Sequence, residues 1–387
     1  MRESTILIVS PIPSHPQFQG NSARIYRLNR LWQQAGFKVH FLYFGMEGIS
    51  PESEVAMREA WDNFVFLAPI GPAAKPSLGE EYAIDDWFDD RLGAKVTELC
   101  SIFDYSHVLV NYVWMSKVLD YVPKSSTKII DTHDRFANRN ARAMQQGVDA
   151  NWFSTTEEEE RYGLERADLV FAITEEEQKA FETTVTVPVC CIGHVLPKQS
   201  ILDCTRGGRI TIGYFGSDNP YNVSSLHKLI HGINTYSLAH PADNAAVFNA
   251  KLKLVIAGSI CSRVTDDTAS TGDLEIELLG RIDNLSTLVR RVDFLVNPMS
   301  GGTGLKIKTL DFLSYGKPML ATADAMVGIS DADAGANQEM ELSQMISLLC
   351  ESGVTSLKTM ASLEQGRLRA CYNERHLSNF QQQINNK

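Results

Sequence analysis

The chain has 387 residues, of which 44% are hydrophobic and 21% charged, and this composition predicts a globular protein of two domains of about 150–200 residues. It holds no run of about 18 apolar residues, so a membrane-spanning helix is not expected. A formal net charge of −11 excludes nucleic acid as the main partner and gives no support to a strongly basic membrane-docking face.

The N-terminal segment predicts a protein that stays in the cytosol. Its apolar run covers only residues 6–9 and is followed by prolines, so no secretory signal is expected. The seven cysteines are scattered, without a C-x-x-C pair or a histidine-rich segment. This spacing predicts reduced, packed thiols in place of disulfides or a zinc site.

The first half predicts strands that alternate with amphipathic helices, which is the pattern of a parallel sheet covered on both faces. Residues 4–9 read as a buried strand, and a glycine-containing loop leads to a helix over 22–36 with Gly36 as its cap. Further strands are expected over residues 39–44, 107–113, 128–132 and 167–174.

Three local features complete the first half. Thr174 and Glu177 form a T-x-x-E capping box for a helix over 175–181. Residues 157–161 carry opposite charges three and four positions apart and are interpreted as a solvated helix face. Around residues 188–210 the periodicity lapses into a stretch punctuated by Pro and Gly, which is interpreted as the interdomain linker.

The second half follows the same pattern without a visible internal repeat. Strands are expected over 209–216, 251–258, 277–282, 293–298 and 317–322, and helices over 224–233, 285–292, 304–316 and 362–383. The predicted fold class is α/β, with two doubly wound, Rossmann-like domains. The expected domains are residues 1–200 and residues 205–365, with a C-terminal helix over 366–387 that packs back on the first domain.

The segment from Ser300 to Pro318 carries the strongest chemical signal. A strand leads into Ser-Gly-Gly-Thr-Gly, and a helix is expected to start at once. Glycines permit close backbone approach, and first-turn N–H groups with the helix dipole attract an anion such as a diphosphate. Lys308, with Lys306 near the first turn, can neutralise phosphate charge, and Asp311 can accept hydrogen bonds from ribose hydroxyls. A tight turn with solvated lysines is the alternative interpretation.

This segment resembles the donor-binding signature of the GT4 family of retaining glycosyltransferases with the GT-B fold (glycosyl transferases group 1), in which a glycine-rich junction precedes a helix with an acidic residue and then G-K-P. The stretches THD, RADLVFAITEEE, TIGYFGSDNPYNVSSL, LVIAG and LLGRIDNL resemble other landmarks of that family, so the resemblance covers most of the chain. It implies two domains facing across a cleft. It also implies a donor-binding set made of Gly216, Arg281, Gly302, Thr303, Gly304, Lys306, Lys308 and Asp311.

The chain departs from the family pattern at two places. The E-x7-E pair of many members has Thr303 at its first position and Asp311 at its second. The Arg…Lys pair that often follows the first donor-domain strand is missing, since residues 217–220 read Ser-Asp-Asn-Pro. Phosphate charge is therefore assigned to Lys306 and Lys308.

The segment Thr132-His133-Asp134 follows a predicted strand, at the edge where open α/β sheets place ligands. In the families that it resembles, a His near this point touches the donor sugar or the reaction centre. His133 is therefore the catalytic candidate beside Lys308, with Asp134 and Arg135 as its neighbours. A solvated or helix-capping His is the alternative.

The loop before the first helix resembles the N-terminal glycine loop of the family. The resemblance implies a place in the cleft for Gly20, Asn21 and Arg24, and Asn21 or Ser22 is the expected N-cap. A plain structural turn is the alternative. The aromatic run at Tyr112 and Trp114 is interpreted as core in preference to an acceptor platform.

The resemblance implies transfer of a sugar from a nucleotide-sugar donor to a glycan or lipid-linked acceptor, with retention, in surface polysaccharide biosynthesis, in the cytoplasm or at the inner face of the membrane. Retaining transfer resembles front-face substitution, in which the leaving phosphate itself can take the acceptor's proton. No metal cofactor is expected, because the D-x-D string Asp331-Ala332-Asp333 lies in a polar loop. Two alternatives stay open: a GT-B nucleotide-sugar epimerase, and a catalytically degenerate GT-B domain that acts as a partner subunit or glycan-binding module.

Overall fold

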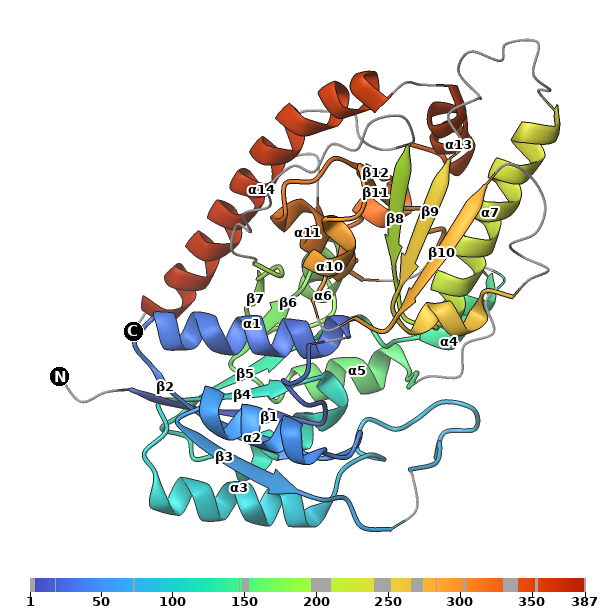
Figure 1. Ribbon diagram of the computed structural model, residues 1–387. Helices are drawn as coiled ribbons and strands as arrows, with labels where there is room; N and C mark the ends of the chain where they lie inside the picture. Colours follow the sequence, from blue (N-terminus) through green and yellow to red (C-terminus); the bar gives the residue numbers. More distant parts are fainter. Residues whose placement is uncertain are drawn as a thin grey trace. The chain divides into compact units, whose positions relative to one another are not determined.

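The computed structural model describes residues 4–17, 19–71, 74–145, 147, 153–195, 210–239, 252–265, 274–282, 284–301, 304–329, 340–351 and 354–385. The chain divides into two compact units. Unit 1 comprises Met1–Val195, Thr303–Leu305 and His376–Lys387, and unit 2 comprises Leu196–Gly302 and Lys306–Arg375. Each unit has its own parallel sheet and its own core (Figure 1).

Unit 1 is built on a parallel sheet with the strand order β3-β2-β1-β4-β5-β6-β7. The strands are β1 (Thr5–Ser10), β2 (Lys38–Phe44), β3 (Asn63–Leu67), β4 (His107–Asn111), β5 (Thr127–Asp131), β6 (Leu169–Ala172) and β7 (Val189–Cys191). The strand order reverses between β1 and β4. In open α/β sheets ligands bind outside the carboxyl ends of the strands at such a reversal.

Helices connect these strands and cover the sheet, with α1 and α3 on opposite faces (Figure 1). They are α1 (Gly20–Gln34), α2 (Pro51–Ala60), α3 (Asp90–Ile102), the 3-10 helix η1 (Val113–Tyr121), α4 (Arg139–Gln145), α5 (Glu157–Leu164) and α6 (Glu175–Glu182). Gly36 has a φ of 90° just beyond α1, so it ends that helix as the sequence predicts.

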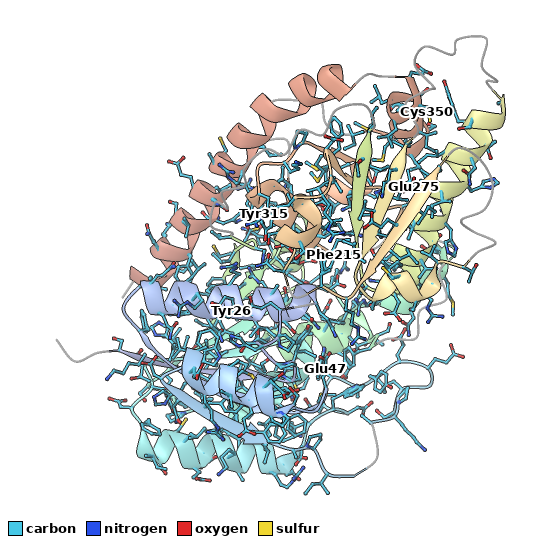
Figure 2. All side chains as sticks on the ribbon, viewed as in Figure 1. Tyr26, Glu47, Phe215, Glu275, Tyr315 and Cys350 are labelled. Atoms are coloured by element: carbon cyan, nitrogen blue, oxygen red, sulfur yellow. The ribbon has the colours of Figure 1, made fainter. Side chains whose placement is uncertain are left out.

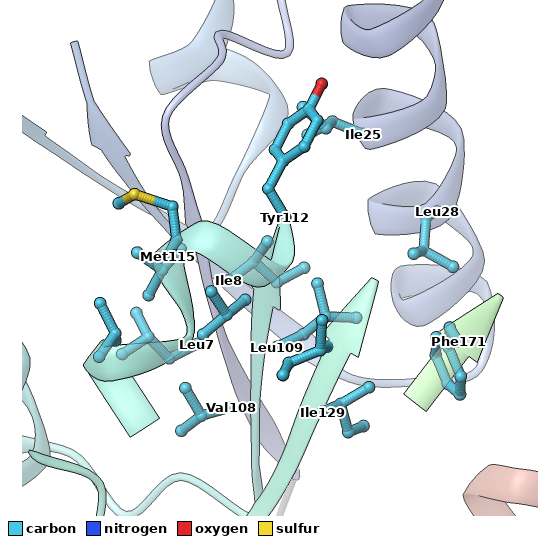
Figure 3. Close-up of a cluster of buried hydrophobic side chains, with 14 of the residues drawn as sticks. Leu7, Ile8, Ile25, Leu28, Val108, Leu109, Tyr112, Met115, Ile129 and Phe171 are labelled. Atoms are coloured by element: carbon cyan, nitrogen blue, oxygen red, sulfur yellow. The ribbon is translucent and has the colours of Figure 1, made fainter. Parts of the chain in front are cut away.

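The core of unit 1 forms where α1 packs on the central strands. Ile25 and Leu28 lie on the inner side of α1, beside Leu109 of β4 and Ile129 of β5 (Figure 3). β1 and β4 carry apolar runs over residues 6–9 and 108–110 because helices cover the sheet on both faces. The sheet is therefore a rigid base for the polar residues that follow each strand.

Unit 2 is built on a five-stranded parallel sheet with the order β10-β9-β8-β11-β12. The strands are β8 (Thr211–Phe215), β9 (Lys253–Ala257), β10 (Glu275–Gly280), β11 (Phe294–Asn297) and β12 (Met319–Ala321). Here the order reverses between β8 and β11. The α/β, doubly wound character predicted for both halves is confirmed.

The helices of unit 2 are α7 (Pro220–Ala239), the 3-10 helix η2 (Ser259–Arg263), α10 (Ser286–Val289), α11 (Ile307–Ser314), α12 (Ala323–Met326), α13 (Leu342–Glu351) and most of α14 (Val354–Asn385). α7 packs closely on α13: a Cβ at Gly232 would lie only 2.2 Å from the side chain of Ile346. Glycine at that position therefore allows the two helices to approach.

The last part of α14 belongs to unit 1. The backbone N–H of Gly193 donates to Nδ1 of His376 at 2.9 Å, and Nδ2 of Asn379 donates to the carbonyl of Cys191 at 3.0 Å. These bonds satisfy the backbone at the end of β7, which is the edge strand of the sheet. The C-terminal helix thus completes the core of unit 1.

Two local interpretations from the sequence need correction. The predicted linker over 188–210 includes strand β7 at its start, and residues 196–209 lie outside the described part of the chain. The solvated face expected over 157–161 is wrong for Glu160, which is 4% exposed and accepts a hydrogen bond from the backbone N–H of Phe136 at 2.5 Å. Burial raises the pKa of Glu160 to about 7. This carboxyl group anchors the loop that follows β5.

Candidate functional site

In unit 2, three backbone segments meet at the carboxyl edge of the sheet, where Phe215 ends β8 (Figure 2). The N–H of Gly216 donates to the carbonyl of Ala257 at 3.1 Å, and the N–H of Gly258 donates to the carbonyl of Gly280 at 2.8 Å. Gly258 has a φ of 103°, and a Cβ there would lie 2.1 Å from the carbonyl oxygen of Gly216. Only glycine fits this crossing, in which the chain after β9 passes against the carbonyl of Gly216.

Lys308 of α11 lies at the same end of the unit 2 sheet. Its Nζ donates to Oδ1 of Asn222 at 2.6 Å and to the hydroxyl of Tyr214 at 3.2 Å. The ammonium also lies 4.7 Å from the centroid of the Tyr214 ring. Both partners are neutral groups, an amide and a phenol. Within the part of the chain that the structure describes, Lys308 forms no ion pair.

The side chain of Lys308 is half-buried. Burial lowers the pKa of Lys308 to about 7, and the positive charge of Lys306 lowers it in the same direction. A negatively charged ligand at this place would favour the ammonium form and would be attracted by it. None of the described carboxylates forms an ion pair with this ammonium, so its assignment to phosphate stays a prediction.

Polar groups of the neighbouring loops extend this edge. Asp218, which follows β8, receives hydrogen bonds from the hydroxyl of Ser259 at 2.9 Å and gives its own N–H to the same oxygen. The pKa of Asp218 is lowered, first by these hydrogen bonds and then by the positive charges of Arg263 and Arg281. Arg281, predicted to bind the donor, is therefore close to this edge, and it is exposed.

The helix after the glycine-rich junction starts later than the sequence predicts. α11 begins at Ile307, with Lys306 as its N-cap in a non-helical conformation. Gly301 and Gly304 have φ values of 75° and 68°, so the chain turns in the left-handed region before the helix can start. Gly302 and Thr303 lie outside the described residues.

The remaining donor-side candidates differ in exposure. Lys306 is 8% exposed, whereas Asp311 is half-buried on α11. The apolar side chains of Leu310 and Leu313 are buried under the helix, as its periodicity predicts. The proposed contacts of Lys306 with phosphate and of Asp311 with ribose stay predictions.

In unit 1, Arg24 of α1 and Asp131 of β5 form a buried ion pair. Nε of Arg24 donates to Oδ2 of Asp131 at 3.1 Å, and its Nη2 donates to Oδ1 at 2.8 Å. The third nitrogen, Nη1, donates to the carbonyl of Gly193 at 2.5 Å. The exposed fractions are 2% and 0% for the two side chains. Arg24, which was predicted at the cleft, is thus buried, and each of its three side-chain nitrogens donates to a partner within unit 1.

His133 follows β5 in a left-handed backbone conformation with a φ of 62°. Its Nε2 lies 2.9 Å from Oδ1 of Asn111 and 3.3 Å from Oδ2 of Asp131. Nδ2 of Asn111 donates to the carbonyl of Val9, so its Oδ1 can only accept from the histidine. These contacts favour the tautomer with the proton on Nε2, and leave Nδ1 as an acceptor.

A neutral imidazole is strongly favoured at His133. Burial lowers the pKa of His133 to about 4, against the opposing effect of the carboxylate of Asp131. The ring stacks on Tyr112 with a centroid distance of 4.1 Å and an interplanar angle of 13°. Tyr112 also has a positive φ, of 72°. Two non-glycine residues that stack on each other and both have a positive φ are unusual, and such backbone conformations are found at functional sites.

The other acceptor-side candidates surround this pair. Asn21 lies near Tyr112, since its side chain acts to lower the pKa of the tyrosine, which burial raises. Asp134 accepts from Arg139 at 2.9 Å, and Arg135 pairs with Glu157 at 3.3 Å. These two charges are engaged within the protein.

The expected N-cap of the first helix was wrong. α1 begins at Gly20, with Gln19 as its N-cap, in place of Asn21 or Ser22. Oδ1 of Asn21 accepts from the N–H of Ser22, so this side chain is inside the first turn. Gly20 itself is exposed at the start of the helix.

The structure adds four residues that sequence reasoning did not select: Tyr214, Asn222, Asn111 and Asp131. Asn111 and Asp131 end strands, Tyr214 lies within β8 and Asn222 lies in the first turn of α7; an Asn at the carboxyl end of a buried strand was the signal for Asn111. Asn222 and Tyr214 gave no separate signal, since they become significant only through their contact with Lys308.

Two features are absent from the described residues. Nowhere in the described ranges do three His, Cys, Asp or Glu side chains gather closely enough to bind a metal ion. None of the described helices combines the length and the apolar character needed to cross a bilayer.

Residues 209–347 match the family model of glycosyl transferases group 1. This segment covers the strands and helices around Lys308, so the resemblance on which the donor side was predicted is confirmed there. No curated protein sequence matches the chain.

Solved structures match along nearly the whole chain. Sucrose-phosphate synthase from Thermosynechococcus elongatus superimposes with a TM-score of 0.68 at 13% identity, over 98% of this chain and 98% of that chain. TarM, known from S. aureus, gives a TM-score of 0.68 at 10% identity, over 100% and 98%. HepE from Anabaena, in complex with UDP and glucose, gives 0.61 at 14% identity, over 98% and 98%. These likenesses show the GT-B fold.

Proposed function

Since residues 209–347 match the group 1 glycosyl transferases, we propose that this protein transfers a sugar from a nucleotide-sugar donor to a glycan or lipid-linked acceptor. The observation that carries the proposal is the setting of Lys308. Its ammonium lies at the carboxyl edge of the unit 2 sheet with only neutral oxygens as partners. A nucleoside diphosphate supplies the negative charge that this site lacks.

The donor binds at the edge formed by β8, β9 and β10. Glycine at position 258 lets the chain after β9 pass close to Gly216, because a Cβ there would collide with the Gly216 carbonyl oxygen. Lys308 stabilises the diphosphate as it leaves, and charge that develops in the transition state is best stabilised by such a fixed cation. Arg281 adds positive charge from the loop after β10. Asp311 is the proposed partner of the ribose hydroxyls.

In unit 1, His133 is the proposed contact of a sugar hydroxyl. Because its pKa is about 4, the ring is a weak base, and it acts by accepting a hydrogen bond at Nδ1. Deprotonation of the acceptor then falls to the leaving diphosphate. The acceptor oxygen bonds to the anomeric carbon on the face that the diphosphate leaves, the carbon–phosphate oxygen bond breaks, and the proton passes to the diphosphate. This course retains the anomeric configuration.

UDP is the first nucleotide to test, because HepE from Anabaena was solved with UDP-glucose and TarM with UDP. The donor sugar and the acceptor class follow only from the resemblance: we propose a step in surface polysaccharide assembly, without a metal cofactor, on the inner face of the membrane. The proposed lipid-linked acceptor would bring the enzyme to that surface.

The proposal is tested with a panel of UDP-, GDP- and ADP-sugars, first by thermal shift and then by release of the nucleoside diphosphate with and without lipid-linked oligosaccharide acceptors. Acceptor-dependent release that is lost in Lys308→Ala supports transfer. Conversion of the nucleotide sugar to an isomer without acceptor would identify an epimerase. Absence of nucleotide binding across the panel would leave a partner or glycan-binding subunit and would overturn the proposed activity.

A further inference from the structure

Asn222 holds Lys308 with a fixed side-chain orientation. Nδ2 of Asn222 donates to the carbonyl of Ser217 at 3.0 Å and to its hydroxyl at 3.2 Å. The backbone N–H of Asn222 donates to Oδ1 of Asn219 at 2.9 Å, at the start of α7. These bonds turn Oδ1 of Asn222 toward Lys308, and Asn222 itself is 5% exposed.

Tyr214 supplies the second neutral contact. Tyr214 lies in β8 and is fully buried. Its hydroxyl is 3.2 Å from Nζ of Lys308, and its ring lies beneath the ammonium. Burial raises the pKa of Tyr214, so this hydroxyl stays neutral. Strand β8 and helix α7 thus present two uncharged oxygens to the lysine of α11.

The charged groups near this cluster do not neutralise Lys308. Lys306, at the start of α11, is positive and lowers the pKa of Lys308, because two nearby positive charges repel each other. Asp218, after β8, is held by Ser259 and lies 3.9 Å from Arg263. In the part of unit 2 that the structure describes, no carboxylate forms an ion pair with Lys308. A carboxylate in contact would keep the lysine charged at all neutral pH values.

We propose that Asn222 and Tyr214 are positioning residues for Lys308, and that this lysine, with two neutral oxygens as its partners, takes up a proton when a nucleoside diphosphate binds at this site. This inference rests on the proposed function, because it identifies the ligand as the diphosphate part of the donor. The proton comes from solvent and joins the free amine of Lys308, and the diphosphate becomes its counterion.

The coupling has a simple physical cause. Without ligand the pKa of Lys308 is about 7, so above that pH most molecules carry a neutral amine. The two or three negative charges of a diphosphate raise the pKa toward the ordinary range of lysine. Binding above pH 7 therefore takes up most of one proton, and affinity falls as pH rises through 7 and beyond.

Titration calorimetry with UDP, and with GDP and ADP in parallel, measures this proton directly. At pH 8 the phosphates of these nucleotides are already ionised, so a proton taken up belongs to the protein. The observed enthalpy is compared in HEPES and Tris, whose ionisation enthalpies differ. We expect close to one proton per bound nucleotide for the wild type.

Three variants assign the proton. Lys308→Arg keeps a positive charge at every pH used, so uptake should disappear while nucleotide still binds. Asn222→Asp places a carboxylate against Lys308, which charges the amine beforehand; uptake should again disappear, and affinity should fall because the carboxylate repels the diphosphate. Lys228→Arg, on the exposed side of α7, is the matched control and should leave the uptake unchanged.

The outcomes separate the inference from the function. Nucleotide binding without proton uptake in the wild type, or with the same uptake in Lys308→Arg, would overturn the inference while leaving the proposed transferase intact. Uptake that persists in Asn222→Asp, in a variant whose circular dichroism matches the wild type, would remove Asn222 from its role. Failure of UDP, GDP and ADP to bind would overturn both proposals.

Discussion

The carboxylate of Asp131 is bound on both oxygens by Arg24, and its Oδ2 also lies 3.3 Å from Nε2 of His133. One acidic residue at the end of β5 therefore connects the first helix of unit 1 to the candidate catalytic histidine. Because both members of the ion pair are almost fully buried, the contact is rigid, and its loss would leave an uncompensated charge inside the protein.

Arg24→Met should destabilise unit 1 by about 3–5 kcal/mol, since it leaves the carboxylate of Asp131 buried without its cation. The double variant Arg24→Met, Asp131→Leu should recover part of that loss, because apolar replacement of a buried pair is often tolerated. Urea unfolding followed by circular dichroism measures both. A single variant as stable as the wild type would show that the pair contributes little.

His133 should make unit 1 less stable as the pH falls. The unfolded chain binds a proton near the ordinary pKa of 6.5, whereas the folded protein binds it only near 4, so the unfolded state holds more protons in between. Stability is therefore lost as pH drops through the window from 6.5 to 4, by about 3 kcal/mol for this one group.

The comparison variant is His133→Asn, because Asn tolerates the positive φ at this position. Other groups also titrate in the window; Glu160, with its raised pKa, acts in the opposite direction. The difference between the two proteins isolates His133. Identical slopes of unfolding free energy against pH would contradict the assigned shift.

Gly258→Ala should disrupt the donor edge of unit 2. Its Cβ would lie 2.1 Å from the carbonyl oxygen of Gly216, and the residue would also keep a strained φ of 103°. We expect a loss of about 3 kcal/mol or more, from strain and overpacking together. Gly280→Ala is the matched control, since its φ is 68° and its Cβ would meet no atom within 4 Å, so it reports the backbone strain alone. Similar melting temperatures for the two variants would refute the clash.

Lys308→Ala should lower kcat/KM for transfer by about 100-fold or more, because a cation that stabilises the leaving diphosphate is lost. The melting temperature should change little, since the lysine has no ion pair to lose in the described structure. Lys228→Ala serves as the control for a surface lysine. An unchanged kcat/KM would remove Lys308 from the phosphate role.

Asp311→Asn should weaken nucleotide binding by about 1–3 kcal/mol, the usual cost of a lost charge-assisted hydrogen bond. The half-buried position of Asp311 on α11 makes a folding defect unexpected. Calorimetry with UDP and with 2′-deoxy-UDP separates a ribose contact from a general effect of charge. Equal affinity of the two proteins for UDP would contradict the ribose assignment.

The strand and helix pattern of both units could be read from the sequence where apolar runs are continuous. Thr174 is confirmed as the N-cap of α6 by the bond from the N–H of Glu177 to its hydroxyl at 3.1 Å, while the carboxylate of Glu177 accepts from the N–H of Ile173 at 3.3 Å. Strand β3 gave no such signal, because it lies at the edge of the sheet and is only half buried. The start of α11 was misplaced because the left-handed turn at Gly304 delays the helix to Ile307.

The site was predicted less completely than the fold. The chemistry of Lys308 and His133 was visible in their local segments, but the partners that decide their protonation are distant in the chain. Asn222 and Tyr214 lie 86 and 94 positions from Lys308. Arg24 lies 107 positions from Asp131, and no local pattern predicts their buried ion pair. Periodicity reports which face of an element is buried and gives no information on such pairings.

The contacts of His376 and Asn379 with the end of β7 set the order of events during synthesis. Unit 1 contains nearly all of the first 195 residues, yet it also needs the last turns of α14. On the ribosome, its sheet can assemble early, but the edge at Cys191 and Gly193 stays unprotected until residues 376–385 have emerged. A fusion or truncation at the distal end of the chain should therefore reduce the folding yield of the N-terminal sheet, which is formed from residues translated long before.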